Sequence, residues 1–336
     1  MMQWFRYPDG ARQNTVMLAL TLGGYVVGVA LLGAAAAWLN ALGVLLVAQT
    51  LVWSAYYIHE FAHQSILKSA AANERWGQMM SWVCGSCYAA FPDLRRKHIR
   101  HHVERADVVT FDYRTLLRRH GMLRRVVLAL EWLYLPAVEL IMHGYVIALP
   151  FIDERKRGGR GRMVVIVALR STGFALLGWW SWKALCLYAL AYLIFITVLR
   201  FADCFQHTYD AYPVLDEQAI PQDKVRDRAY EQLNTYSNVM GLNHPLLNLL
   251  WLNFGYHNAH HDRPGQPWHR LPACHHKLYD AAYAQVVPVR ELLRSFHINR
   301  VRRVLSDDYG SVQAPGTARR ADGFLGAIGV SFLTAV

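Results

Sequence analysis

The apolar residues of this chain gather in long runs without charge. Residues 15–38 and 41–58 contain no Asp, Glu, Lys or Arg, and a run of about 18 or more such residues is a candidate transmembrane helix. The stretch 163–203 is long enough for two further spans and is interrupted by Arg170 and Lys183. The pattern therefore predicts four transmembrane helices, at about 15–38, 41–60, 163–181 and 184–203.

A further hydrophobic region, 126–151, has a different pattern. Its apolar residues form a stripe rather than a continuous run, and it contains Glu131, Glu139 and His143. A charged residue at the centre of a bilayer costs about 2.5–3.5 kcal/mol on insertion scales. We therefore expect this region to form a helix that lies at the membrane interface or against the spans, without crossing the bilayer.

The positive charges predict the orientation of the spans. The expected turn at Leu39-Asn40 has no charge and the turn near Trp182-Lys183 has one, whereas clusters such as 95–97, 118–119 and 155–157 lie in the other hydrophilic segments. By the positive-inside rule these segments face the cytoplasm. The four spans then form two hairpins that leave both ends of the chain on the cytoplasmic side.

These elements predict an all-α integral membrane protein, with four transmembrane helices in two hairpins, interfacial helices and a cytoplasmic helical cap. We expect residues 1–310 to form one membrane domain and 311–336 to form a linker-like tail. The tail ends in an apolar run, 324–336, which is too short to span a bilayer. Docking at the membrane surface and disorder both remain open for this run.

Composition supports a membrane protein. Hydrophobic residues make up 54% and charged residues 18%, whereas soluble domains carry about 25% charged residues. The net charge of +11 suits loops that face anionic lipid, or an acidic soluble partner. No nucleic-acid-binding motif accompanies the charge, so no nucleic acid is expected as a partner.

Three histidine clusters carry the candidate chemistry. They read HxxxH, HxxHH and HxxHH, and their members are His59, His63, His98, His101, His102, His257, His260 and His261. Neutral imidazole is the commonest metal ligand of proteins. Histidines at i and i+4 share one face of a helix, and we expect the same of the i and i+3 pair in HxxHH. The adjacent third histidine then points about 100° further round, toward a second metal centre.

The number of histidines indicates two metal ions. Eight imidazoles are too many for one zinc, which takes about four ligands, and His207 can add a ninth. Soluble di-iron proteins use mainly carboxylates in Glu-x-x-His motifs, and that pattern does not dominate here. Iron suits nitrogen-rich sites that activate dioxygen. Zinc in both sites is the alternative and would imply a membrane hydrolase. A metal transporter is disfavoured, because transporters place their ligands near the bilayer midplane.

The order and spacing of the three clusters, in register with the hairpins, resembles the membrane fatty acid desaturase and hydroxylase superfamily, over about residues 15 to 290. The resemblance implies that the eight clustered histidines bind two iron ions at the cytoplasmic membrane face. His207 stands where the family often has one more ligand. Asp203 stands four residues before it, where some members have an Asn that reaches the metal through water, so Asp203 is a possible ligand or a neighbour of one.

The same resemblance implies the reaction class. Members of the superfamily oxidise an acyl or alkyl chain with dioxygen and two electrons. We expect a fatty acid or fatty acyl substrate taken from the lipid bilayer, and a separate electron donor (ferredoxin-like, rubredoxin-like or cytochrome b5-like) with its reductase. Desaturation is the preferred outcome. Hydroxylation, or oxidative decarboxylation of a free fatty acid to a terminal 1-alkene, are the alternatives.

Charged residues near the histidine clusters are candidates for supporting roles. Metal-bound histidines usually donate their other N–H to a carboxylate or carbonyl. The acidic candidates for this role are Glu60, Glu104, Asp107, Asp112 and Asp262. The basic candidates for binding a substrate head group, whether a carboxylate, a CoA phosphate or a carrier protein, are Arg95, Arg96, Lys97 and Arg100.

Overall fold

The computed structural model describes residues 4–217, 219–241, 244–280, 282–313, 316 and 319–335. These parts are helical and contain isolated bridges but no strand. Four helices are long and apolar enough to cross a membrane, as the sequence predicts. They are Pro8–Leu32, which includes α1 (Ala11–Leu32); α2 (Ala37–Ala62); Glu154–Trp180, which includes α8 (Arg160–Trp180); and α9 (Trp182–Cys204).

The first hairpin turns earlier than the sequence indicates. The expected turn at Leu39-Asn40 lies inside α2, and α1 ends at Leu32. Asn40 explains the difference, because its amide donates to the carbonyls of Leu31, Leu32 and Ala34 at 2.9, 3.1 and 2.9 Å. The last carbonyls of a helix have no partner within it. A side chain from the following helix supplies one here, and nothing in the uncharged run marks the position.

The hairpins differ in how much of their surface they bury. Glycines let α1 and α2 approach closely, since a Cβ on Gly43 would lie 3.0 Å from the Gly28 carbonyl oxygen. Close contact through small residues is typical of helices in membranes. In its most apolar window α2 is 67% buried, whereas the span that contains α8 is 11% buried. We therefore place α2 at the centre of the helix bundle and α8 toward lipid.

The region 126–151 forms two helices rather than the one expected. They are α6 (Gly121–Trp132) and α7 (Ala137–Ile152), and α7 has 16 residues, fewer than a span requires. The chain breaks at Tyr134, where φ is +62°, shortly before Pro136. Proline disfavours the helical conformation for the residue before it, here Leu135. The apolar stripe of the sequence therefore continues across a break between two helices.

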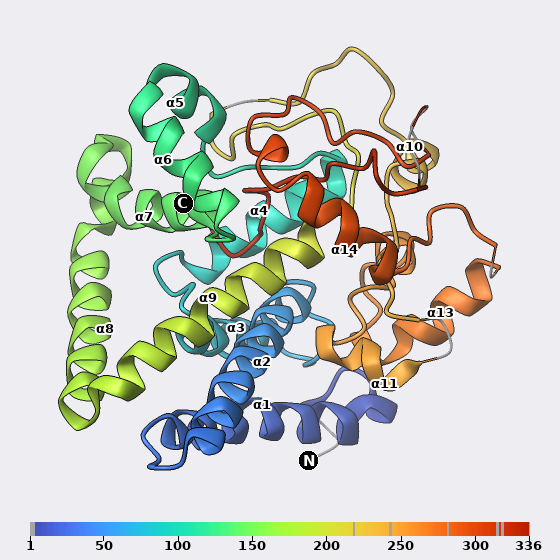
Figure 1. The fold of residues 1–336 in the computed structure, drawn as a ribbon. Helices are drawn as coiled ribbons and strands as arrows, with labels where there is room; N and C mark the ends of the chain where they lie inside the picture. Colours follow the sequence, from blue (N-terminus) through green and yellow to red (C-terminus); the bar gives the residue numbers. More distant parts are fainter. Residues whose placement is uncertain are drawn as a thin grey trace.

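The remaining helices pack along the spans, as α3 does against α2, or form a cap at the end where α2 and α9 finish. They are α3 (Ala70–Cys84), α4 (Phe91–Glu104), α5 (Tyr113–Arg119), α10 (Arg228–Leu233), α11 (Pro245–Asn248), α12 (His257–Asp262), α13 (Leu271–Leu278) and α14 (Val289–Ile298), with short 3-10 turns at Leu249–Trp251, Trp268–Arg270 and Arg302–Val304. Figure 1 shows the α1–α2 and α8–α9 turns at the lower left, and α4, α10 and α14 toward the opposite side.

The end of the chain packs inside the molecule, which differs from the linker that its composition indicates. Phe324, Ala327 and Leu333 are each less than 5% exposed. The Ala327 amide donates to the Cys204 carbonyl at 2.9 Å, at the end of α9. Burial of these apolar side chains away from water stabilises this arrangement. Cys204, the partner of Ala327, lies more than 100 residues away in the sequence.

A buried ion cluster joins α9 to α6 and α7. Arg200 pairs with both Glu131 and Glu139, and all three residues are less than 9% exposed. Glu131 and Glu139 are the charged residues from which we predict that 126–151 does not cross the bilayer, and they lie inside the protein. Removal of one member of a buried pair leaves an uncompensated charge.

We predict that Arg200→Ala lowers the free energy of unfolding by about 3–5 kcal/mol, because Glu131 and Glu139 would both lose the buried cation that compensates their charge. Unfolding of the protein in lipid nanodiscs provides the measurement. Glu154→Ala is the control, since Glu154 pairs with Arg160 at the surface, where its side chain is 73% exposed, and it should leave the unfolding midpoint almost unchanged. Equal shifts in the two variants would contradict the prediction.

Candidate metal centre

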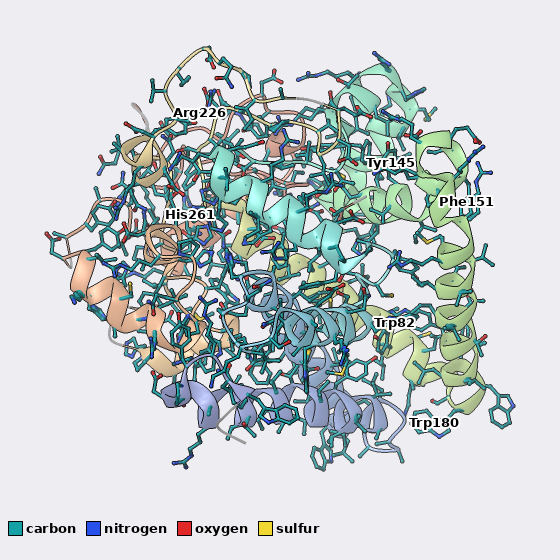
Figure 2. The ribbon with its side chains drawn as sticks, turned by 180° about the vertical axis from the view of Figure 1, so that it is seen from behind. Trp82, Tyr145, Phe151, Trp180, Arg226 and His261 are labelled. Carbon is teal, nitrogen blue, oxygen red and sulfur yellow. The ribbon has the colours of Figure 1, made fainter. Side chains whose placement is uncertain are left out.

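Four segments carry the nine candidate histidines to one place. His59 lies in the last turn of α2, and His63 caps that helix. Helix α4 carries three histidines, and the short helix α12 carries three more. His207 follows α9 directly. Figure 2 places His261 on the side of the molecule away from Trp180, which ends α8 at the hairpin turn.

The first group contains five histidines. Its members are His59, His63, His98, His102 and His260. The Nε2 atom of His260 lies 3.1 Å from that of His59 and 3.1 Å from that of His102. The Nε2 atom of His98 lies 3.1 Å from that of His102 and 2.6 Å from that of His63. One ligand atom from each ring lies within 4.8 Å of all the others.

The second group contains four histidines, and its members are His101, His207, His257 and His261. The Nε2 atom of His207 lies 3.1 Å from that of His101 and 2.8 Å from that of His257. The ligand atoms of this group also lie within 4.8 Å of one another. The two groups adjoin, since the rings of His102 and His261 have centroids 4.2 Å apart.

The two HxxHH clusters divide between the groups in a different way from the one expected. We expected the i and i+3 histidines to share a face, but His98 and His102 share one group and His101 joins the other. In α12, His257 and His261 lie together and His260 is the one apart. Three residues turn a helix by about 300° and four by about 400°, so i+4 lies closer in angle to i than i+3 does.

Burial keeps these imidazoles neutral. It lowers the pKa of His98, His102, His207, His257 and His260 well below the ordinary value, that of His63 to about 3 and that of His261 to about 4. A neutral imidazole has one N–H and one lone pair. Groups of four or five rings with converging Nε2 atoms cannot satisfy all of these lone pairs by hydrogen bonds among themselves. A metal ion at the centre of each group would accept them, so the donor set fits two ions.

Two of the histidine rings donate from Nδ1, the nitrogen on the side away from Nε2, to protein oxygens. His261 donates from Nδ1 to Glu231 Oε1 at 2.8 Å, and His101 donates from Nδ1 to the Ala106 carbonyl at 2.8 Å. Asp107 Oδ1 lies 3.3 Å from the same nitrogen of His101. These contacts fix the tautomer that leaves Nε2 free to bind a metal.

Asp107 is thus the predicted acidic candidate that lies beside a histidine Nδ1, and the other candidates have other partners. Glu60 accepts hydrogen bonds from Ser65 Oγ and the Trp268 amide at 2.6 and 3.1 Å, and its Oε1 is 3.7 Å from His59 Nδ1, beyond hydrogen-bond length. Asp112 caps α5 by accepting from the Thr115 amide, and Asp262 pairs with Arg228. These three carboxylates therefore bind backbone amides, a serine hydroxyl and an arginine in place of a histidine Nδ1.

Glu231 is the supporting residue that sequence reasoning missed. It lies in the six-residue helix α10, 26 positions before His257, and no motif surrounds it. Arg105 donates to its second oxygen at 3.1 Å. Only the packing of α10 against α12 brings its carboxylate to His261.

Asp203 and Lys97 lie on a small cavity beside the histidines. The cavity has a volume of about 40 Å³, and its lining includes His98, His101 and His207. Asp203 is partly buried, and its Oδ2 atom is buried without a hydrogen-bond partner. Burial lowers the pKa of Lys97 to about 7. Both residues therefore line the cavity where they could contact a bound molecule.

The other predicted head-group residues are distributed differently. Arg96 pairs with Asp216 at 2.5 Å, and Arg100 pairs with Glu104 at 2.5 Å. Arg95 is partly buried. Of the four cations, only Lys97 lines the cavity beside the histidines.

A comparison with protein-family models matches residues 36–293, which is 258 of the 336 residues, to the family described as fatty acid desaturase. The matched region includes all three histidine clusters and His207. No curated protein matches the chain.

We predict that Glu231→Gln weakens metal retention by about 10–100-fold, because His261 loses the carboxylate that orients its ring and raises its basicity. Competition with a chelator, followed by metal analysis of the protein, measures the change. Glu217→Gln is the matched control, since Glu217 pairs with Arg155 and its side chain is 47% exposed. Equal retention in Glu231→Gln and the unmodified protein would show that the carboxylate has no part in holding the ion.

Proposed function

The chain belongs to the fatty acid desaturase family, and from that premise we propose that it is a membrane di-iron oxidase. It uses dioxygen and two external electrons to oxidise a fatty acyl chain, and desaturation is the expected outcome. Oxidative decarboxylation of a free fatty acid to a terminal 1-alkene, or hydroxylation, are the alternatives. The observation that carries the proposal is the pair of adjoining all-imidazole groups at the ends of α2 and α9.

The ligand set favours iron over zinc. A structural or catalytic zinc takes about four ligands, and one of the two groups offers five imidazoles. Iron bound there would supply the activation of dioxygen. The residues of the chain would hold the two ions next to each other and keep bulk water away, because six of the nine histidines are 5% exposed or less.

The position of the groups suits a substrate drawn from lipid. The rings gather where the spans end, so an acyl chain leaving the bilayer has a short path to them. We propose that this end faces the cytoplasm, because the basic segments of the cap favour that side. A soluble electron donor can then reach the centre from the cytoplasm. The net charge of +11 would attract an acidic donor such as a ferredoxin-like protein.

A zinc-dependent membrane hydrolase is the alternative from another class. Imidazole suits zinc as well as iron, and a hydrolase would require neither dioxygen nor a reductant. Metal analysis of the purified protein, together with the oxygen dependence of turnover, separates the two functions.

We predict that the iron-loaded protein in bilayers, supplied with dioxygen, a ferredoxin and its reductase, oxidises an isotopically labelled fatty acid. Mass spectrometry identifies the outcome: loss of two hydrogens for desaturation, gain of one oxygen for hydroxylation, and a hydrocarbon one carbon shorter for decarboxylation. His101→Ala and His260→Ala should each reduce turnover to background, because each removes a ligand from one group.

The matched control is His120→Ala, because His120 is exposed and lies outside both groups, and it should retain turnover. The two ligand variants should still insert in the membrane, since the spans are held by lipid and helix packing. If no acyl substrate gives an oxidised product with iron and a working reductant present, the proposed function is wrong.

A second prediction tests the orientation. Single cysteines at Arg119 and Arg157 should react with an impermeant thiol reagent from the cytoplasmic side, and a cysteine at Ala35 should react from the other side. The exposed Cys186 and the partly exposed Cys274 are replaced by Ser beforehand. Labelling of residues 119 and 157 from opposite sides would contradict the two-hairpin arrangement.

A further inference from the structure

Residues 328–335, which we call the terminal segment, lie directly against the histidines. The ring of Phe332 has its centroid 5.7 Å from that of His59 and 5.6 Å from that of His98. Phe254 is the other phenylalanine against His59, at 4.6 Å, and it belongs to the chain that leads into α12. A substrate carbon that approaches the five-histidine group would meet the position that Phe332 now holds.

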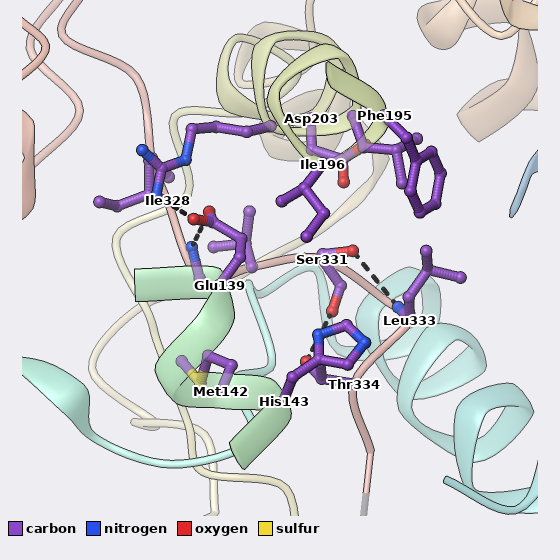
Figure 3. A pocket seen from close by; sticks show the side chains of 15 residues that line it. Glu139, Met142, His143, Phe195, Ile196, Asp203, Ile328, Ser331, Leu333 and Thr334 are labelled. Atoms are coloured by element: carbon purple, nitrogen blue, oxygen red, sulfur yellow. Dashed lines mark hydrogen bonds and ion pairs between the residues drawn. The ribbon is translucent and has the colours of Figure 1, made fainter. Parts of the chain in front are cut away.

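The terminal segment fills the space that continues from the metal centre. One cavity, of about 40 Å³, lies between Phe332 and the histidines, and a second, of about 30 Å³, lies between α7, α9 and the segment. Figure 3 shows Ile328, Ser331, Leu333 and Thr334 beside side chains of α7 and α9. Cavities of this size hold a few waters at most. A long acyl chain fits there only if the segment leaves.

The residues of the segment resemble an acyl chain in chemistry. Ile328, Phe332, Leu333 and Ala335 are apolar and buried, so they place hydrocarbon along the path from the histidines to the space between α7 and α9. Both cavities are lined in part by Val330 and Asp203. The segment therefore extends from the cavity beside the histidines to the cavity beside α9.

Apolar packing and side-chain hydrogen bonds, without a backbone ladder, hold the segment in place. It lies in no helix or strand, and Lys97 Nζ donates to the carbonyls of Ser331 and Thr334, each at 2.7 Å. Thr110 Oγ1 also donates to the Thr334 carbonyl at 2.7 Å. Side-chain donors of this kind can bind a substrate carboxyl or carbonyl oxygen equally well. Irregular segments without backbone ladders are typical of the parts of a protein that open locally.

Lys97 is the residue that would change partners. It is 2% exposed, and within the described residues it forms no ion pair with a carboxylate. Buried cations normally have an anionic partner. The two carbonyls and the Thr110 hydroxyl at 3.2 Å provide only neutral oxygens.

We propose that the terminal segment occupies the acyl-chain site and is displaced when substrate binds, with the substrate carboxyl group taking the place of the Ser331 and Thr334 carbonyls at Lys97. The inference rests on the proposed function, because it assumes an acyl substrate. The preceding residues stay fixed, since the Gly326 amide donates to the Tyr309 carbonyl at 3.0 Å and the Ala327 amide donates to the Cys204 carbonyl at 2.9 Å. Gly329, with φ of +75°, lies where the fixed and displaced parts meet.

The displacement can be measured without turnover. In a protein with Cys186 and Cys274 replaced by Ser, a Thr334→Cys variant in bilayers is treated with a thiol reagent. We expect labelling to be slow alone and at least several-fold faster with saturating dodecanoic or octadecanoic acid. Ser81→Cys is the control, because Ser81 is buried in α3, outside both cavities, and its labelling should not change.

Kinetics provide the second measurement. Deletion of residues 329–336 should lower KM several-fold at unchanged kcat, because the substrate no longer competes with the segment. Phe332→Ala tests the same idea if the deletion does not fold, with Phe151→Ala at an exposed site as its control. A fall in kcat with KM unchanged, or a change in the position of attack, would mean that the segment is a fixed wall of the site and would overturn the proposal.

The two proposals fail in different ways. Unchanged labelling of Thr334→Cys, while radiolabelled dodecanoic acid is retained by the protein, overturns the displacement and leaves the proposed function intact. Faster labelling with no oxidised product from any variant keeps the displacement and overturns the proposed function.

Discussion

The structure depends on nine imidazoles brought together where the spans end. Each ring has a lone pair that water would otherwise satisfy, and the converging Nε2 atoms leave these lone pairs facing one another. Under the proposed function, a pair of bound cations would resolve that arrangement. The ends of α2 and α9, the helices α4 and α12 and the contacts of Glu231 and Asp107 all position these rings, so metal binding would be coupled to the folding of the cap.

The spans provide a rigid base on which the histidines converge. Helix α2 is the most buried of the four spans and ends in His59 and His63, so its position fixes two ligands of the five-histidine group. Helix α9 ends just before His207 and is joined to α6 and α7 by the Arg200 cluster. A ligand at the end of a packed helix has little freedom, which suits a site that must hold two ions at a fixed separation.

The space beside the histidines bears on the proposed function as much as the histidines do. The outcome of chain oxidation would depend on which carbon is brought to the metal centre, and hence on the side chains that line the approach. Phe254 and Phe332 lie against His59 from two different parts of the chain. One precedes the third histidine cluster and the other lies in the terminal segment, so the end of the chain takes part in shaping the site.

The sequence by itself determined the four spans, the all-helical class and the residues that gather at the candidate metal centre. Long uncharged runs have few alternatives to a membrane helix, and histidines at helical spacing share a face for geometric reasons. Helical geometry pairs the i and i+4 histidines of each HxxHH cluster, and only the tertiary structure decided which pair joins which group, because that depends on how α4 and α12 face each other. It also decided that Glu231 orients His261, that Asn40 caps α1, and that residues 328–335 lie beside His59 and His98. These contacts form only when separate segments pack together. A local sequence pattern does not indicate which distant segments will pack.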